Sequence, residues 1–228
     1  MSETTIVVIC IVGAFLGALV LAYRYGQKHR QLIDELAAAQ GWTLSRTDTE
    51  QLAEKLGKML PYHRVSVSTV MTVELGERNL YLVDGAVWRY AGENSPGFSS
   101  LCILESAAVP NLPTGVEVFG GTKIDQLLLE DQVDMGNTPF AKEFIVQSKD
   151  RESAWRLLDP AMQQVFLDYW NKPLFNPATT LFGNGHVALL AGRIDQEERW
   201  LDLVEFAGQI ESCLARQGGW GPSLRGGL

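Results

Sequence analysis

The longest hydrophobic run of the chain lies at its N-terminus. Residues 6–22 contain no charged side chain, and Thr5 and Tyr23 extend the run to 19 positions. A helix rises about 1.5 Å per residue, so this run is just long enough to cross a hydrocarbon core of roughly 30 Å. The pattern predicts an N-terminal tail and transmembrane helix over residues 1–23.

The charges that flank this run predict its orientation. No Lys or Arg precedes it, whereas Arg24, Lys28 and Arg30 follow it. A cleaved signal peptide usually has basic residues before a shorter apolar core, although Val20 and Ala22 would fit a cleavage site, so cleavage stays an open alternative. Basic flanks remain in the cytoplasm. We therefore expect a single-pass protein of the bacterial inner (cytoplasmic) membrane, with its N-terminus outside and its C-terminal domain in the cytoplasm.

After the run, apolar residues recur at helical spacing. Leu32, Ile33, Leu36 and Ala37 share one stripe, which predicts a juxtamembrane helix over residues 24–40 that ends at Gly41. The same spacing predicts helices at 49–60, 151–158, 160–170 and 197–216, and a weakly signalled helix at 124–129.

Alternating apolar and polar positions predict strands between these helices. They lie at 65–75, 79–90, 101–106, 116–119 and 140–148, with a hairpin at 179–192 that turns at Asn184 and Gly185. The predicted fold class is α+β, with a mainly antiparallel sheet of about six strands and helices packed on one side. This cytoplasmic domain would span residues 41–216, followed by a flexible Gly-rich tail at 217–228.

The charge distribution argues against a nucleic-acid partner. Residues 24–64 contain seven basic and five acidic side chains, whereas residues 65–228 contain 12 basic and 21 acidic ones. Phosphate backbones repel such an acidic surface. The three cysteines, Cys10, Cys102 and Cys213, show no spacing typical of a disulfide framework, in agreement with a reducing compartment.

A block of residues in the second half resembles a known group of proteins. The sequence FAKEFIVQSKDRESAWRLLDP, Phe140 to Pro160, is the clearest part, and the order of elements extends the likeness over about residues 41–214 without the stretch 91–121. The chain is similar to a family of uncharacterised bacterial membrane-anchored proteins. This resemblance implies a single membrane span and an α+β cytoplasmic domain, and it assigns no catalytic residue.

No catalytic, metal-binding or cofactor-binding site is predicted. His29, His63 and His186 lack ligands at the spacing of a zinc site. GGTK at 120–123 is an incomplete phosphate loop, the acidic residues Glu130, Asp131 and Asp134 do not have calcium-loop spacing, and no nucleophile motif is present. An enzyme, such as an uncharacterised hydrolase, is therefore the third hypothesis.

Three surfaces are candidates for binding instead. Gly13 and Gly17 form a G-x-x-x-G pattern that would allow the membrane helix to form a homodimer, and Arg24, Lys28 and Arg30 would contact lipid headgroups. Aromatic residues at Trp155, Phe166, Tyr169 and Trp170 suggest a ligand or partner patch, although core packing is the commoner role. The leading hypothesis is a non-catalytic interaction or scaffold module for a membrane-associated protein. The alternative is binding of a small apolar ligand or lipid headgroup.

Overall fold

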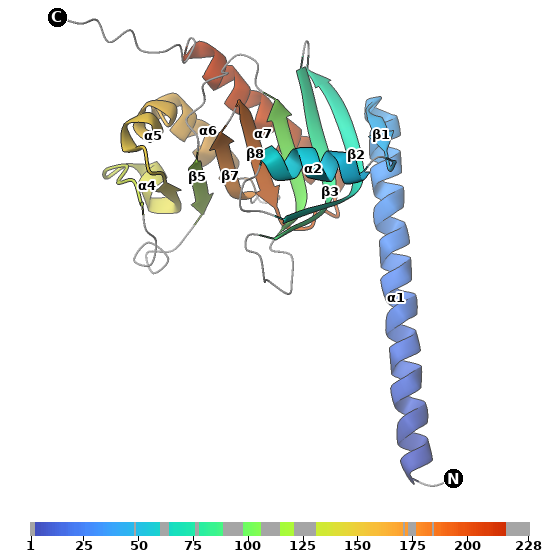
Figure 1. Cartoon of the computed structure of the whole chain (residues 1–228). Helices are drawn as coiled ribbons and strands as arrows, with labels where there is room; N and C mark the ends of the chain where they lie inside the picture. Colours follow the sequence, from blue (N-terminus) through green and yellow to red (C-terminus); the bar gives the residue numbers. More distant parts are fainter. Residues whose placement is uncertain are drawn as a thin grey trace, which may run out of the picture. The chain divides into compact units, whose positions relative to one another are not determined.

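The computed structural model of the chain forms two compact units, residues 1–41 and residues 42–228 (Figure 1). The structure describes residues 3–47, 49–59, 64–75, 78–88, 98–105, 115–120, 131–170, 172, 177–183 and 185–217, with side chains of the first helix described from Ala14 onward. The helix predicted at 124–129 and most of the predicted tail lie outside these residues.

The first unit is one continuous helix, α1 (Glu3–Gln40). Gly41 ends it with a φ of +69°, and the Gly41 N–H lies 3.4 Å from the Ala38 carbonyl oxygen. Glycine adopts this left-handed backbone without steric cost, which confirms the predicted helix end. Among the described residues, no helix is both long enough and apolar enough to cross a membrane. Residues 6–13 of the predicted span lie outside the described side chains.

In the described residues the second unit forms one sheet of eight antiparallel strands, where the sequence predicted about six. In spatial order the strands are β1 (Thr43–Ser45), β2 (Arg64–Leu75), β3 (Arg78–Trp88), β4 (Phe98–Glu105), β8 (His186–Ala191), β7 (Pro177–Gly183), β5 (Val116–Gly120) and β6 (Phe144–Gln147). The predicted class, α+β with an antiparallel sheet, is confirmed.

The strand predicted at 140–148 is wrong in its first half. Pro139–Glu143 forms the short helix α4, and only Phe144–Gln147 is extended. The Thr138 side chain accepts a hydrogen bond of 3.1 Å from the Ala141 N–H, and Pro139 stands in the first turn, where a missing N–H costs nothing. These two starting signals explain why a helix forms there.

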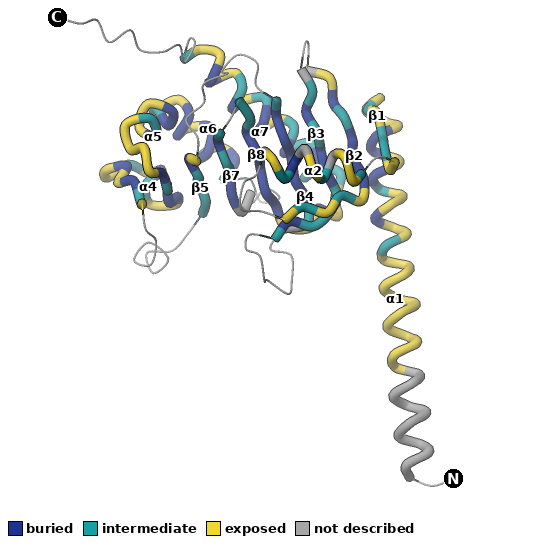
Figure 2. The backbone as a smooth tube through the Cα atoms, viewed as in Figure 1, coloured by how far each residue is buried: buried dark blue, intermediate teal, exposed yellow. Residues whose placement is uncertain are grey.

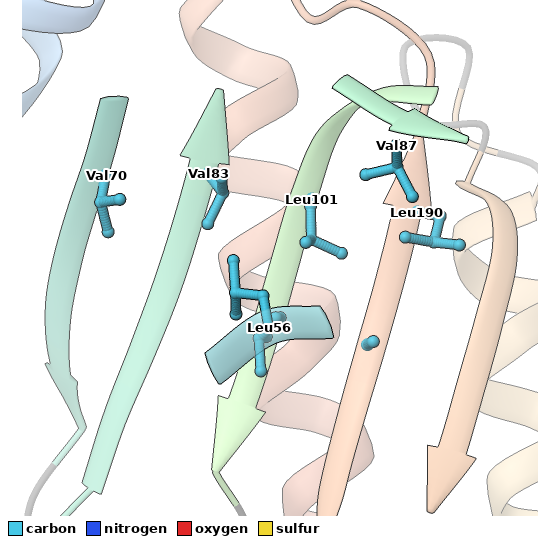
Figure 3. Packing of buried hydrophobic residues seen from close by; sticks show 8 residues of the cluster. Leu56, Val70, Val83, Val87, Leu101 and Leu190 are labelled. Carbon is cyan, nitrogen blue, oxygen red and sulfur yellow. The ribbon is translucent and has the colours of Figure 1, made fainter. Parts of the chain in front are cut away.

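Helices cover both faces of the sheet, whereas the sequence predicted them on one. Leu56 of α2 (Thr49–Met59) packs on Val70, Val83, Leu101 and Leu190, and Figure 3 shows α2 on the opposite side of these strands from α7 (Glu197–Arg216). Adjacent strand residues point to opposite faces, so Leu181 joins the α2 side and Phe182 joins the other.

The second face is covered by α4, α6 (Pro160–Trp170) and α7, while α5 (Arg151–Leu157) precedes α6 in the chain. Phe182 of β7 contacts Phe166 of α6, which in turn contacts Phe206 of α7. The central strand β4 is thereby buried on both faces, as shown by its adjacent buried residues Leu101 and Cys102. Period-two alternation alone does not reveal this second covered face.

Candidate functional site

Exposed apolar side chains concentrate on α1. Among the described residues, eight large hydrophobic side chains are exposed, and seven of them lie in α1 with 48% to 69% of their surface exposed (Figure 2). They are Phe15, Leu16, Leu19, Val20, Leu21, Tyr23 and Tyr25. At 3.6 residues per turn these positions surround the helix axis and leave no gap wider than about 100°. The exposed apolar surface is therefore a band around the helix and not a stripe.

A polar boundary follows this band directly. The Tyr23 hydroxyl accepts a hydrogen bond of 2.7 Å from the side-chain amide of Gln27, one turn toward the C-terminus. Arg24, Lys28 and Arg30 are all exposed, and we call these three residues the basic collar. Along the axis the band's two tyrosines, Tyr23 and Tyr25, come after its other residues and flank Arg24 at the start of the basic collar.

Of the glycine pattern predicted for self-association, Gly17 lies within the band and Gly13 precedes it. A side chain added at Gly17 would meet no other atom within 4 Å, so the helix surface at this position is open. The surroundings of Gly13 lie outside the described side chains. The predicted homodimer stays a prediction.

Two of the four predicted patch residues belong to an aromatic core. Phe166 contacts Phe140, Phe144, Phe182 and Phe206, with ring centroids 5.3 to 6.5 Å apart, and Tyr169 packs on Phe206 at 4.9 Å. Both Phe166 and Tyr169 are buried. Rings in mutual contact fill the space between α6, α7 and the sheet, so a ligand would have to displace side chains to enter among them.

Trp170 is half-buried at the edge of this core. A Cβ atom at Gly120 of β5 would overlap the Trp170 ring, which also packs edge-on against Phe144 at 5.0 Å. The indole Nε1 donates a hydrogen bond of 3.1 Å to the Glu143 carboxylate. Glycine at position 120 thus allows an aromatic ring to lie directly on the strand.

Trp155 lies apart from the other three. Within the described part of the second unit, Trp155 is the one large hydrophobic residue that is exposed, with 46% of its surface accessible. Its ring edge approaches Gly136, which closes a turn by donating its N–H to the Asp134 side chain at 2.8 Å. The structure therefore divides the predicted patch into an interior pair, an edge residue and a single exposed indole.

The sequence pattern missed a charged cluster where α6 ends beside α7. Lys172 Nζ lies 2.9 Å from the Asp202 carboxylate and 3.0 Å from that of Glu205, and 4.3 Å from the centre of the Tyr169 ring. The hydrogen bond from Lys172, followed by that from Tyr169, lowers the pKa of Glu205. The hydrogen bond to Asp202 is the main reason that the pKa of Lys172 is raised. Thirty residues separate Lys172 from Asp202, so no local spacing predicts this pairing.

The candidate catalytic groups are scattered. His186 faces Glu105 across the β4–β8 pair, while His63 and residues 121–130, which include Glu130, lie outside the described part of the chain. Within the described residues, no group of three or more His, Cys, Asp or Glu side chains is placed to hold a metal ion. Burial raises the pKa of the Cys102 thiol far above its usual range. A buried, protonated thiol is a poor nucleophile.

Comparison with known proteins gives a fold but no family. No protein-family model and no curated protein matches the sequence. The crystal structure of the mycobacterial trehalose monomycolate transport factor A, TtfA, superposes with a TM-score of 0.58 over 83% of this chain and 95% of the TtfA chain, at 13% sequence identity. At this identity the likeness concerns the fold alone. The chain therefore shares its α+β architecture with a mycobacterial transport factor.

Proposed function

We propose that this chain is a membrane-anchored, non-catalytic interaction module, and that it assists lipid transport at the inner face of a bacterial cytoplasmic membrane. The observation that carries the proposal is the band of exposed apolar side chains around α1. The transport role is drawn from the similarity in fold to the transport factor TtfA. The resemblance of Phe140 to Pro160 to membrane-anchored bacterial proteins agrees with the anchor.

The distribution of the apolar residues around α1 favours lipid over a protein partner. A helix that binds one partner shows an apolar stripe with a polar opposite face, whereas a helix that is apolar all round is surrounded by an apolar medium. Positions from Phe15 to Tyr23 carry no charged side chain on any side of the helix and are therefore of the second kind. The uncharged sequence continues toward the N-terminus as far as Ile6, which supports a full span for residues 6–23.

The proposed topology follows from the basic collar. Basic residues close to the end of a span stay on the cytoplasmic side, and the segment before the span has Glu3 but no Lys or Arg. The N-terminus would then lie outside and the second unit in the cytoplasm. Anchoring confines the domain to the membrane surface, which raises its effective concentration toward partners in the same membrane.

Trp155 is the residue we propose as the contact for a membrane-associated protein. Tryptophan is enriched among the residues that dominate binding energy, and this indole is exposed and held beside the Gly136 turn. The alternative, a small apolar ligand enclosed by Phe166 and Tyr169, is less favoured because neighbouring rings already contact both side chains.

Membrane extraction tests the anchor. Full-length chain expressed in bacteria should remain in the membrane pellet after alkaline carbonate treatment. The Leu16→Asp/Leu19→Asp variant places two carboxylates in the band, and most of this variant should leave the membrane pellet. The reason is that a carboxylate inside a span costs about 3 kcal/mol. Gln31→Asp/Gln40→Asp is the matched control, since it adds the same charge to exposed polar positions of α1 and should stay in the pellet. Release of the unmodified chain by carbonate would contradict the proposal.

A further inference from the structure

The boundary between the apolar band and the basic collar of α1 has the composition of a membrane–water interface. Tyr23 is 68% exposed, and its hydroxyl bonds to Gln27 on the polar side of the boundary. Tyrosine is enriched at this depth because its ring prefers the apolar side and its hydroxyl the wet side. In a membrane-spanning α1, lipid headgroups would therefore lie beside the turns that follow Tyr23.

The collar residues occupy the turns that follow Tyr23. Arg24 is adjacent to Tyr23, and Lys28 follows one turn later on the same side of the helix, about 6 Å further along the axis. Arg30 is about 9 Å from Arg24 along the axis, which is close to the screening length at physiological ionic strength. All three side chains are exposed, and no acidic residue occurs between Glu3 and Asp34.

Resting on the proposed membrane anchor, we propose that Arg24, Lys28 and Arg30 bind anionic phospholipid headgroups and that α1 thereby selects an anionic leaflet. Arginine and lysine side chains donate several charge-assisted hydrogen bonds to phosphate oxygens. Each basic side chain near an anionic surface favours binding by up to about fivefold. Arg24 and Lys28 lie on one side of the helix, so we expect this pair to contribute most to the preference for anionic lipid.

Lipid selectivity in reconstituted vesicles tests this inference. The full chain is reconstituted into phosphatidylcholine vesicles that contain either spin-labelled phosphatidylglycerol or spin-labelled phosphatidylcholine, and the fraction of each probe immobilised by the protein is measured by electron spin resonance. We expect a several-fold preference for phosphatidylglycerol. The preference should fall at least about twofold in Arg24→Gln/Lys28→Gln and on raising the salt to 0.5 M, because salt shortens the screening length.

The control variant Lys142→Gln/Lys149→Gln removes the same charge from exposed positions of the second unit and should keep the preference. Equal binding of both probes, or an unchanged preference in Arg24→Gln/Lys28→Gln, would overturn the collar and leave the anchor standing. Absence of an immobilised component with either probe would overturn the anchor and the collar together.

Discussion

At the residue scale, the aromatic positions show what a sequence pattern does and does not reveal. Dense aromatic residues between 150 and 180 predicted either one patch or core packing, and the structure places Phe166 and Tyr169 in the core and Trp155 on the surface. Helical spacing distinguishes the buried stripe of α6 from its exposed side. It does not show that Trp170 lies on Gly120, because that contact depends on how α6 crosses the sheet.

The contact between Gly120 and Trp170 predicts opposite effects for two glycine substitutions. In Gly120→Ala the new methyl group would overlap the Trp170 ring, so we expect a loss of about 1–3 kcal/mol in the free energy of unfolding. In Gly208→Ala, inside α7, the methyl group meets no atom within 4 Å, and the stability should stay equal or rise by up to about 1 kcal/mol. Urea unfolding of the full chain in detergent measures both. Equal midpoints for Gly120→Ala and the unmodified chain would contradict the packing.

The Lys172 cluster predicts a pH-dependent contribution to stability. The pKa of Glu205 is lowered, so its contribution is present above the ordinary value of 4.5 and is lost as the pH falls through the lowered pKa. The pKa of Lys172 is raised, so its contribution is present below 10.5 and is lost as the pH rises through the raised pKa. Lys172→Gln should cost about 0.5–1 kcal/mol between pH 6 and 9, a value kept small by solvent screening.

Urea midpoints of Lys172→Gln and the unmodified chain at pH 3.5, 7 and 9 measure this difference. Lys58→Gln is a suitable control, because it breaks an exposed i,i+4 pair with Glu54 and should shift the midpoint less. A difference between Lys172→Gln and the unmodified chain that is as large at pH 3.5 as at pH 7 would show that the ion pairs are not its source.

At the element scale, starting signals and apolar stripes predicted most helices well. α2, α5, α6 and α7 form where the stripes predicted them, and β2, β3 and β8 follow the alternating segments. Two elements were not predicted from the sequence. β1 has three residues, too few for alternation to be recognised, and α4 was hidden because a single helical turn joins a strand without a loop. Sheet order was not predictable either, since β4 pairs with β8 across more than 80 residues of chain.

The start of α6 depends on one side chain. Asp159 stands just before Pro160, the first residue of α6, and its carboxylate accepts a hydrogen bond of 2.8 Å from the Met162 N–H. Asp159→Ala leaves that N–H without its cap, and we expect a loss of about 1 kcal/mol. Asp159→Asn keeps an oxygen acceptor at the same position and should be close to the unmodified chain. Thermal unfolding followed by near-ultraviolet circular dichroism compares them; equal stability of the alanine and asparagine variants would refute the cap.

At the scale of the whole molecule, the proposed function rests on the exposed apolar residues of α1 and on the filled aromatic core of the second unit. Uncharged residues 6–22 predicted an apolar N-terminal element, and the structure adds that the apolar side chains from Phe15 to Tyr25 surround the axis. The second unit buries Phe166, Tyr169 and Phe206 beside a sheet that is covered on both faces, and it exposes Trp155. This arrangement agrees with the proposed recruitment of partners at the surface of the domain.

The most direct measurement is the depth of the band in a bilayer. A fluorescent label at Leu19→Cys, in a chain with Cys10→Ala, reports on the centre of the band. The label should attach selectively there, because the free cysteines Cys102 and Cys213 are buried. In phosphatidylcholine vesicles we expect quenching of the label by lipids brominated on their acyl chains and protection from aqueous iodide, with the reverse at the matched position Gln31→Cys. Quenching of the Leu19→Cys label by iodide as strong as that at Gln31→Cys would contradict the membrane anchor.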